Sequence, residues 1–172
     1  MKKALMGAAF LLLFFLLQCT AFKYFAVNNI GPNLLIILTC TYGFMYSDKE
    51  GLLMGFFAGI LCDIFFGPIL GINALIFMFI GFTAGKFNRL FYAEDIVLPG
   101  SIFVAGDITY GLIYYILLFL LRRRFQFTYY LMNVILPETI YTLVGAIAFY
   151  PLLLLCINKL NKIGQRRRKG FA

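Results

Sequence analysis

Six long runs of apolar residues, separated by short polar or turn-forming stretches, make up most of the chain. A helix needs about 20 apolar residues, within a range of about 17–25, to cross the hydrocarbon of a bilayer. The pattern therefore predicts an all-α membrane protein, a single bundle of six transmembrane helices over residues 1–172. We expect these helices at residues 4–22, 30–46, 51–66, 69–85, 96–121 and 131–157, followed by a basic cytoplasmic tail at 158–172.

The third run holds a regular spacing of glycines around one carboxylate. Gly55, Gly59, Asp63, Gly67 and Gly71 recur every four residues. Four helical residues advance about 40° past a full turn, so Gly55, Gly59 and Asp63 lie on one broad face. A face without large side chains lets another helix approach closely, and we therefore predict that Gly55, Gly59, Gly67 and Gly71 form a packing surface.

Three carboxylates within the apolar runs are candidate sites: Asp63, Asp107 and Glu138. An ionisable group in hydrocarbon is costly, so each is expected in the protein interior or in a water-filled cavity. Two interpretations stay open for them. They could fix helix packing through hydrogen bonds, or they could line a cavity or a partner site. For Asp63 we expect polar or backbone partners, because no basic residue is near it in the sequence.

The first run has an alternative interpretation as a lipoprotein signal ending at Cys19. Lys2 and Lys3 before an apolar stretch fit such a signal. Gln18 fits it poorly, because a small residue is expected directly before a cleaved cysteine, and the apolar run continues to Phe22. We therefore expect an uncleaved first helix.

Composition supports a membrane protein and argues against several kinds of site. The chain is 63% hydrophobic and 13% charged, with a mean hydropathy of +0.92, unlike a soluble domain. It has no histidine, which rules out a Ser-His-Asp triad, and no phosphate-binding GxxxxGK[ST] motif. The four cysteines stand singly, so we predict neither a metal site nor a disulfide framework. We expect no cofactor and no enzymatic activity.

Basic residues in the loops predict the orientation in the membrane. With both termini in the cytoplasm, eleven of the fifteen lysines and arginines lie inside and four lie outside. No folded domain presents this charge to nucleic acid, so we expect none to bind. A basic group at the end of the chain is expected to anchor it to anionic lipids of the inner leaflet. That group is Arg166, Arg167, Arg168 and Lys169.

A second basic group is expected on the outer side: Arg122, Arg123 and Arg124. These side chains could anchor the helix end to lipid phosphates. Alternatively, Arg122 could be a counter-ion for Glu138 on the next helix, because pairing would relieve the cost of both charges. The choice stays open at this point.

Several segments resemble the MreD family of rod-shape-determining proteins, and their order along the chain matches over nearly its whole length. They are Pro32-Asn33-Leu34-Leu35, the Asp48–Glu50 turn, GLLMGFFAGILCDIFFGPILG, Ala74-Leu75 with Gly81, and Leu136-Pro137-Glu138-Thr139-Ile140-Tyr141. The resemblance implies a component of the cell-elongation machinery in the bacterial inner membrane. It also implies a fold similar to the substrate-binding subunits of energy-coupling-factor vitamin transporters.

The resemblance further implies partners and a function. MreC is the expected partner, docking its single transmembrane helix on the bundle. The MreB filament and the RodA glycosyltransferase with its transpeptidase are expected in the same complex. The protein would then be a non-enzymatic scaffold that couples peptidoglycan synthesis to cell shape. Because a fold does not settle function, a transporter subunit that binds a lipid or small molecule in an outward-facing polar cavity stays as the alternative.

Overall fold

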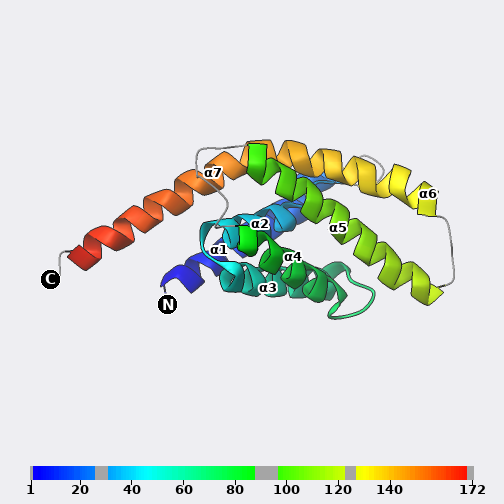
Figure 1. Cartoon of the computed structure of the whole chain (residues 1–172), viewed down its shortest axis with the longest axis horizontal. Helices are drawn as coiled ribbons and strands as arrows, with labels where there is room; N and C mark the ends of the chain where they lie inside the picture. The colour runs from blue at the N-terminus through cyan, green and yellow to red at the C-terminus, as the bar shows by residue number, and fades with distance from the viewer. Residues whose placement is uncertain (1, 26–30, 88–96, 123–126, 170–172) are drawn as a thin grey trace.

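The computed structural model is helical throughout most of the residues that it describes, which are 2–25, 31–87, 97–122 and 127–169. Side chains are described for 6–20, 31–87, 99–117 and 127–156. The helices are α1 (Lys2–Phe25), α2 (Leu34–Met45), α3 (Asp48–Phe66), α4 (Ile72–Lys86), α5 (Val97–Arg122), α6 (Phe127–Tyr130) and α7 (Leu136–Lys169) (Figure 1). A π-helical turn, Leu131–Ile135, joins α6 to α7, so the sixth predicted helix is one continuous helical run of three parts.

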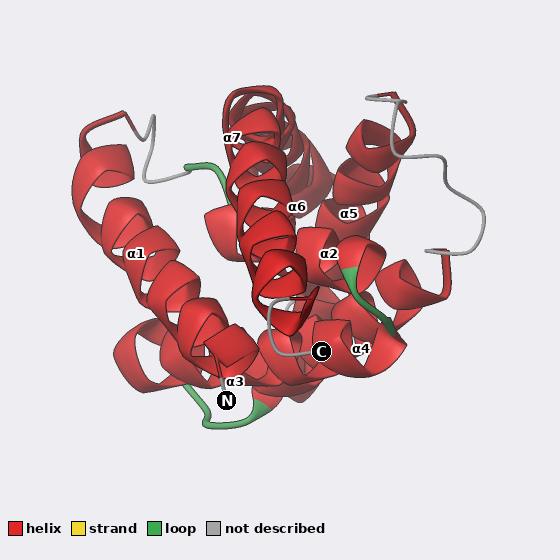
Figure 2. Ribbon diagram, turned by 90° about the vertical axis from the view of Figure 1, so that its left-hand side faces the viewer, coloured by secondary structure: helices red, strands yellow, loops and turns green. Residues whose placement is uncertain are grey.

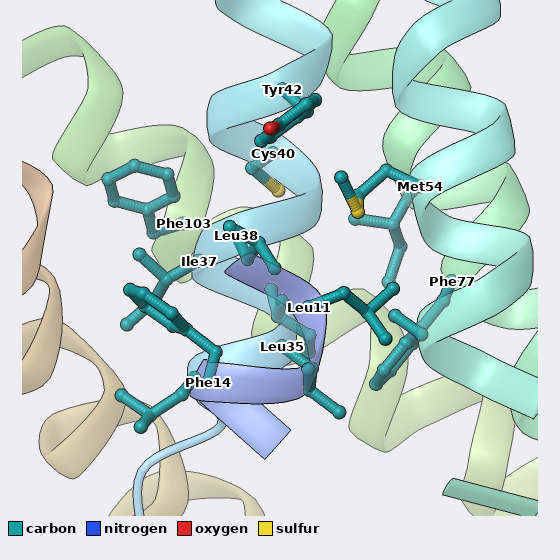
Figure 3. Packing of buried hydrophobic residues seen from close by; sticks show 14 of the residues in the cluster. Leu11, Phe14, Leu35, Ile37, Leu38, Cys40, Tyr42, Met54, Phe77 and Phe103 are labelled. Carbon is teal, nitrogen blue, oxygen red and sulfur yellow. The ribbon is translucent and has the colours of Figure 1, made fainter. Parts of the chain in front are cut away.

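Helix α2, which has only 12 residues in the structure, lies at the centre of the molecule. Every residue from Leu34 to Gly43 is buried. Side chains of α1, α3, α4 and α5 surround it in the apolar core (Figure 3). Among them Phe14, Met54, Phe77 and Phe103 each come from a different helix and converge on α2 (Figure 3). A helix whose residues are buried all around is expected to be apolar on every side, as this one is.

Helix α2 begins later than the sequence predicted, at Leu34 instead of residue 30. The Asn33 side chain accepts a hydrogen bond from the Ile36 amide at 3.3 Å and so caps the helix. Pro32 stands directly before this cap, where a proline disfavours helical geometry for the residue preceding it. Helix α2 is therefore about 18 Å long, at 1.5 Å per residue, shorter than the hydrocarbon of a typical bilayer.

Helices α3 and α4 form the most closely packed pair, and Figure 2 shows them side by side. A Cβ added to Gly55 would overlap the backbone of Phe77, and one added to Gly59 would overlap that of Ala74. In the structure Gly55 and Gly59 therefore lie against another helix of the same chain. The α3 side of this contact also includes Gly51, which meets the backbone of Gly81.

Gly67 and Gly71 do not belong to the packing face, contrary to the prediction from the sequence. Gly67 is the C-terminal cap of α3, and its amide bonds to the carbonyls of Cys62 and Asp63. Gly71 has a φ of 101° and no atom within 4 Å of an added Cβ. Such a φ suits glycine, which has no Cβ to clash in the left-handed region. Both residues thus shape the α3–α4 turn and lie outside the helical face.

The last helical run differs from the prediction at both ends. It begins at Phe127 instead of residue 131, and α7 continues to Lys169 through the segment that the sequence analysis treated as a tail. In Figure 1 the C-terminal part of α7 projects beyond the other helices, and the start of α1 lies toward the same end of the molecule. Directly before Pro137 the helix changes type: the Leu136 amide donates to the Leu131 carbonyl, five residues back.

Two helical stretches are long and apolar enough to cross a bilayer by length and composition, Pro99–Leu117 and Phe127–Cys156. Shorter apolar stretches occur at Met6–Thr20, Leu34–Met45 and Ile72–Lys86. Large apolar side chains stand exposed on α3 and α4, for example Phe57 of α3 at 56% and Phe79 of α4 at 51% exposure. Exposed aromatic side chains at this density are what a lipid-facing or partner-facing surface presents.

Candidate functional site

The three candidate carboxylates lie at two different polar centres. Asp63 is at the C-terminal end of α3, where it faces the turn into α4. Asp107 of α5 and Glu138 of α7 lie near one another, within electrostatic range. Asp63 and Asp107 are almost fully buried, at 2% and 1% exposure, whereas Glu138 is half-buried.

The Asp63 carboxylate caps the N-terminus of α4. Its Oδ2 accepts hydrogen bonds from the Gly71 and Ala74 amides at 2.9 and 3.0 Å, and its Oδ1 accepts one from the Asn73 amide at 3.0 Å. The first backbone amides of a helix have no hydrogen-bond partner within the helix and carry partial positive charge, so they stabilise a carboxylate at this position. The partners of Asp63 are thus backbone groups, the kind of partner that its sequence context predicted.

Gly67 is required beside this cap for steric reasons. A Cβ at Gly67 would lie 2.9 Å from Asp63 Oδ1 and 2.7 Å from Asp63 Cα. The sequence GPILG between α3 and α4 therefore does three things in five residues. Gly67 makes room for the carboxylate, Pro68 stops the helix, and Gly71 supplies the left-handed conformation that directs the next amides back to Asp63.

Asn73 extends the Asp63 centre to α5. While its amide donates to Asp63, its side-chain Oδ1 accepts a hydrogen bond from the Tyr110 hydroxyl at 3.0 Å. The Tyr110 ring packs against Phe77 and stacks on Tyr114. Sequence reasoning missed Asn73, although an asparagine within an apolar run was a signal that could have identified it.

The second centre joins α2, α5 and α7. The Thr142 hydroxyl of α7 accepts a hydrogen bond from the Asn33 amide at 3.0 Å. Thr139 and Thr142 both lie beside Asp107, and the Asn33 side chain lies beside Glu138. Residues far apart in the sequence therefore meet here, and no local motif predicts the meeting. The four-residue spacing of Glu138 and Thr142, which places them on one helix face, is a partial signal in the sequence.

Two groups of predicted site residues lie outside the described side chains. They are the outer basic site, Arg122, Arg123 and Arg124, and the inner-leaflet anchor, Arg166, Arg167, Arg168 and Lys169. The pairing of Arg122 with Glu138 stays a prediction for this reason. Within the described residues, no group of three or more histidine, cysteine, aspartate or glutamate side chains is arranged to hold a metal ion.

Comparison with known proteins identifies the family. The family model described as rod shape-determining protein MreD matches residues 1–160 of the 172-residue chain. Comparison with curated proteins and with solved structures gave no match. The family match spans every helix except the last turns of α7 and includes Asp63, Asp107 and Glu138. The chain therefore belongs to the MreD family of rod-shape-determining membrane proteins.

Proposed function

We propose that this protein is a non-enzymatic scaffold of the cell-elongation machinery in the bacterial inner membrane, coupling peptidoglycan synthesis to cell shape. The family match over residues 1–160 carries the proposal. The expected partners are MreC first, then the MreB filament and RodA with its transpeptidase. In this account the six helical runs cross the membrane, and both termini lie in the cytoplasm.

The arrangement of the helices supports this topology. The start of α1 and the end of α7 lie toward one end of the molecule, as an even number of crossings requires (Figure 1). The basic residues of the predicted tail belong to the projecting part of α7, so the helix would carry their charge to the inner leaflet. The short α2 is enclosed by other helices and needs no lipid-matching length of its own.

The packing of α3 on α4 restricts where a partner helix can dock. A glycine face is the usual surface for close helix association, yet Gly51, Gly55 and Gly59 are already covered by α4. A transmembrane helix of MreC therefore has to use outward-facing side chains. Phe56, Phe57 and Phe66 of α3 are exposed aromatic residues of this kind.

The alternative is a subunit that binds a lipid or small molecule. The second polar centre favours this alternative. Asp107 is buried there without a hydrogen-bond partner among the described residues, and a buried, unpaired polar group suits a ligand site. The fold similarity to energy-coupling-factor subunits, implied by the family resemblance, points in the same direction without deciding it.

Depletion of the protein in its host tests the scaffold. Rod-shaped cells should become round, and newly inserted peptidoglycan, followed with a fluorescent D-amino acid, should lose its pattern along the side wall. Re-expression should restore both. Cells that keep their shape and insertion pattern after depletion, while losing uptake of a small molecule, would favour the alternative.

A further inference from the structure

The two buried aspartates have opposite hydrogen-bond environments. Asp63 receives three backbone amides within 3.0 Å. Asp107 is buried to a similar degree, yet neither of its oxygens has a hydrogen-bond partner among the described residues. A carboxylate ion accepts hydrogen bonds only, and burying it without donors costs several kcal/mol, roughly. The described side chains therefore do not supply the hydrogen-bond donors that an ionised Asp107 would need.

The neighbouring hydroxyl groups have few protons to offer Asp107. The Thr139 hydroxyl donates to the Ile135 carbonyl at 2.8 Å, so its proton is already used. The Thr142 hydroxyl accepts from the Asn33 amide, which leaves its own proton as the one donor on this side of the carboxyl group. One hydroxyl cannot replace the three amides that Asp63 receives.

The groups facing this pair come from three helices and add no described positive charge. Cys40 of α2 lies near Asp107, while Tyr110 and Tyr130 lie near Glu138. The Asn33 side chain faces Glu138 as well. The two basic side chains within the described set are Lys49 and Lys86, and both are exposed.

We propose that Asp107 and Glu138 form a proton-binding site where α5 packs on α7, and that this pair of carboxyl groups holds one proton at neutral pH. A carboxylic acid is a donor as well as an acceptor, so a bound proton gives the buried Asp107 centre a donor and removes one of two negative charges that lie within electrostatic range. The proton comes from bulk water and no bond between heavy atoms changes. The site lies one turn from Leu131–Ile135, and π-helical turns are frequent beside functional groups.

The site makes the contact between α5 and α7 depend on pH. With the proton bound, the pair attracts. When the proton leaves, two carboxylates of like charge lie within electrostatic range of each other, and they repel. Stability is thus fully present while the pair holds its proton and falls as rising pH removes it. Because the pair titrates as a unit, the transition belongs to both residues.

Infrared spectroscopy of the purified full-length protein in lipid nanodiscs tests the site. The carbonyl-stretch band of a protonated carboxyl group should be present in the wild-type protein at neutral pH. It should be unchanged in Asp48→Asn, a control at the partly exposed start of α3, and lost or shifted in both Asp107→Asn and Glu138→Gln. Raising the pH should remove the band from the wild-type protein and lower its thermal stability. Asp107→Asn, which keeps a donor and loses the charge, should lose less stability over the same pH range.

Four results would overturn the proposal. The first is a wild-type spectrum at neutral pH without an acid band, which needs no variant to be folded. The second is a band that both variants leave unchanged. The third is stabilisation by sodium chloride over choline chloride that Asp107→Asn abolishes, which would mean that a metal cation occupies the site. The fourth is a shift of the band in Arg122→Gln as strong as that in Glu138→Gln, which would mean that Glu138 pairs with Arg122 instead of holding a proton together with Asp107.

Discussion

The Asn73 amide donates to Asp63 Oδ1 at 3.0 Å, so a carboxylate at the end of one helix fixes the first turn of the next. The Asn73 side chain then accepts a hydrogen bond from Tyr110, which ties the same turn to α5. The most polar point of the apolar third run is thus the joint between three helices. Its first role in the fold is to position α4 against α3 and α5.

The Asp63 cap should depend on the number of acceptor oxygens that residue 63 provides. Asp63→Asn keeps one acceptor and should destabilise the protein, whereas Asp63→Leu leaves three amides without a partner, two of them buried, and should cost more. Each unsatisfied buried group costs about 1–3 kcal/mol. Thermal unfolding in detergent, with Asp48→Asn as the control, measures the difference. Equal losses in the two variants would show that the negative charge matters more than the hydrogen bonds.

The contact of α3 with α4 should not accept a single added methyl group. In Gly59→Ala the new Cβ would overlap the Ala74 backbone, and backbone atoms cannot move aside as a flexible side chain does. We expect a severe loss of folded protein, larger still in Gly59→Leu. Gly100→Ala is the matched control, because a Cβ at Gly100 has no atom within 4 Å.

The control should be neutral or stabilising by up to about 1 kcal/mol, since alanine favours a helix over glycine. Size-exclusion profiles and thermal unfolding of the purified variants compare the two positions. A fully folded and functional Gly59→Leu protein would contradict the observed packing.

The Tyr110 hydroxyl should contribute to the stability of the fold only through its hydrogen bond to Asn73. Tyr110→Phe keeps the ring against Phe77 and removes one hydrogen bond, so we expect a loss of about 0.5–1.5 kcal/mol. A double-mutant cycle with Asn73→Ala should show that the two losses are not additive. Tyr129→Phe, at an exposed position, is the control and should change little. Additive losses would mean that the two side chains act independently.

The topology predicts which sites an external reagent reaches. In a cysteine-free background, a membrane-impermeant thiol reagent applied to spheroplasts should label Asn28→Cys and leave Gly170→Cys unlabelled until the membrane is opened. The reason is the excess of basic residues on the side that carries both termini. Labelling of Gly170→Cys in intact spheroplasts would reverse the proposed orientation.

The sequence predicted those features of the fold that depend on a local pattern within one segment. The apolar runs located the helices, and the spacing of Gly55 and Gly59 identified the face that α4 covers. The same spacing misled at Gly67 and Gly71, because a four-residue period continues across a turn whose backbone no longer follows a helix. The end of α7 was placed too early, since a polar, basic sequence can remain helical outside the apolar stretch.

The candidate site was harder to predict, because its partners come from distant parts of the chain. Asp63, Asp107 and Glu138 were each identifiable as carboxylates among apolar residues. That Asn33 would bond to Thr142, more than a hundred residues later, depends on how α2 lies against α7. Neither composition nor periodicity specifies the rotation of one helix against another, so Asn73 and Tyr110 entered the site only with the structure.

Native mass spectrometry of the protein purified with and without coexpressed MreC tests the proposed scaffold most directly. We predict that coexpression yields a stable complex containing one copy of each chain, and that the protein purified alone carries no specific small molecule. The account would be contradicted if the protein did not bind coexpressed MreC and was purified with a stoichiometric lipid or small ligand.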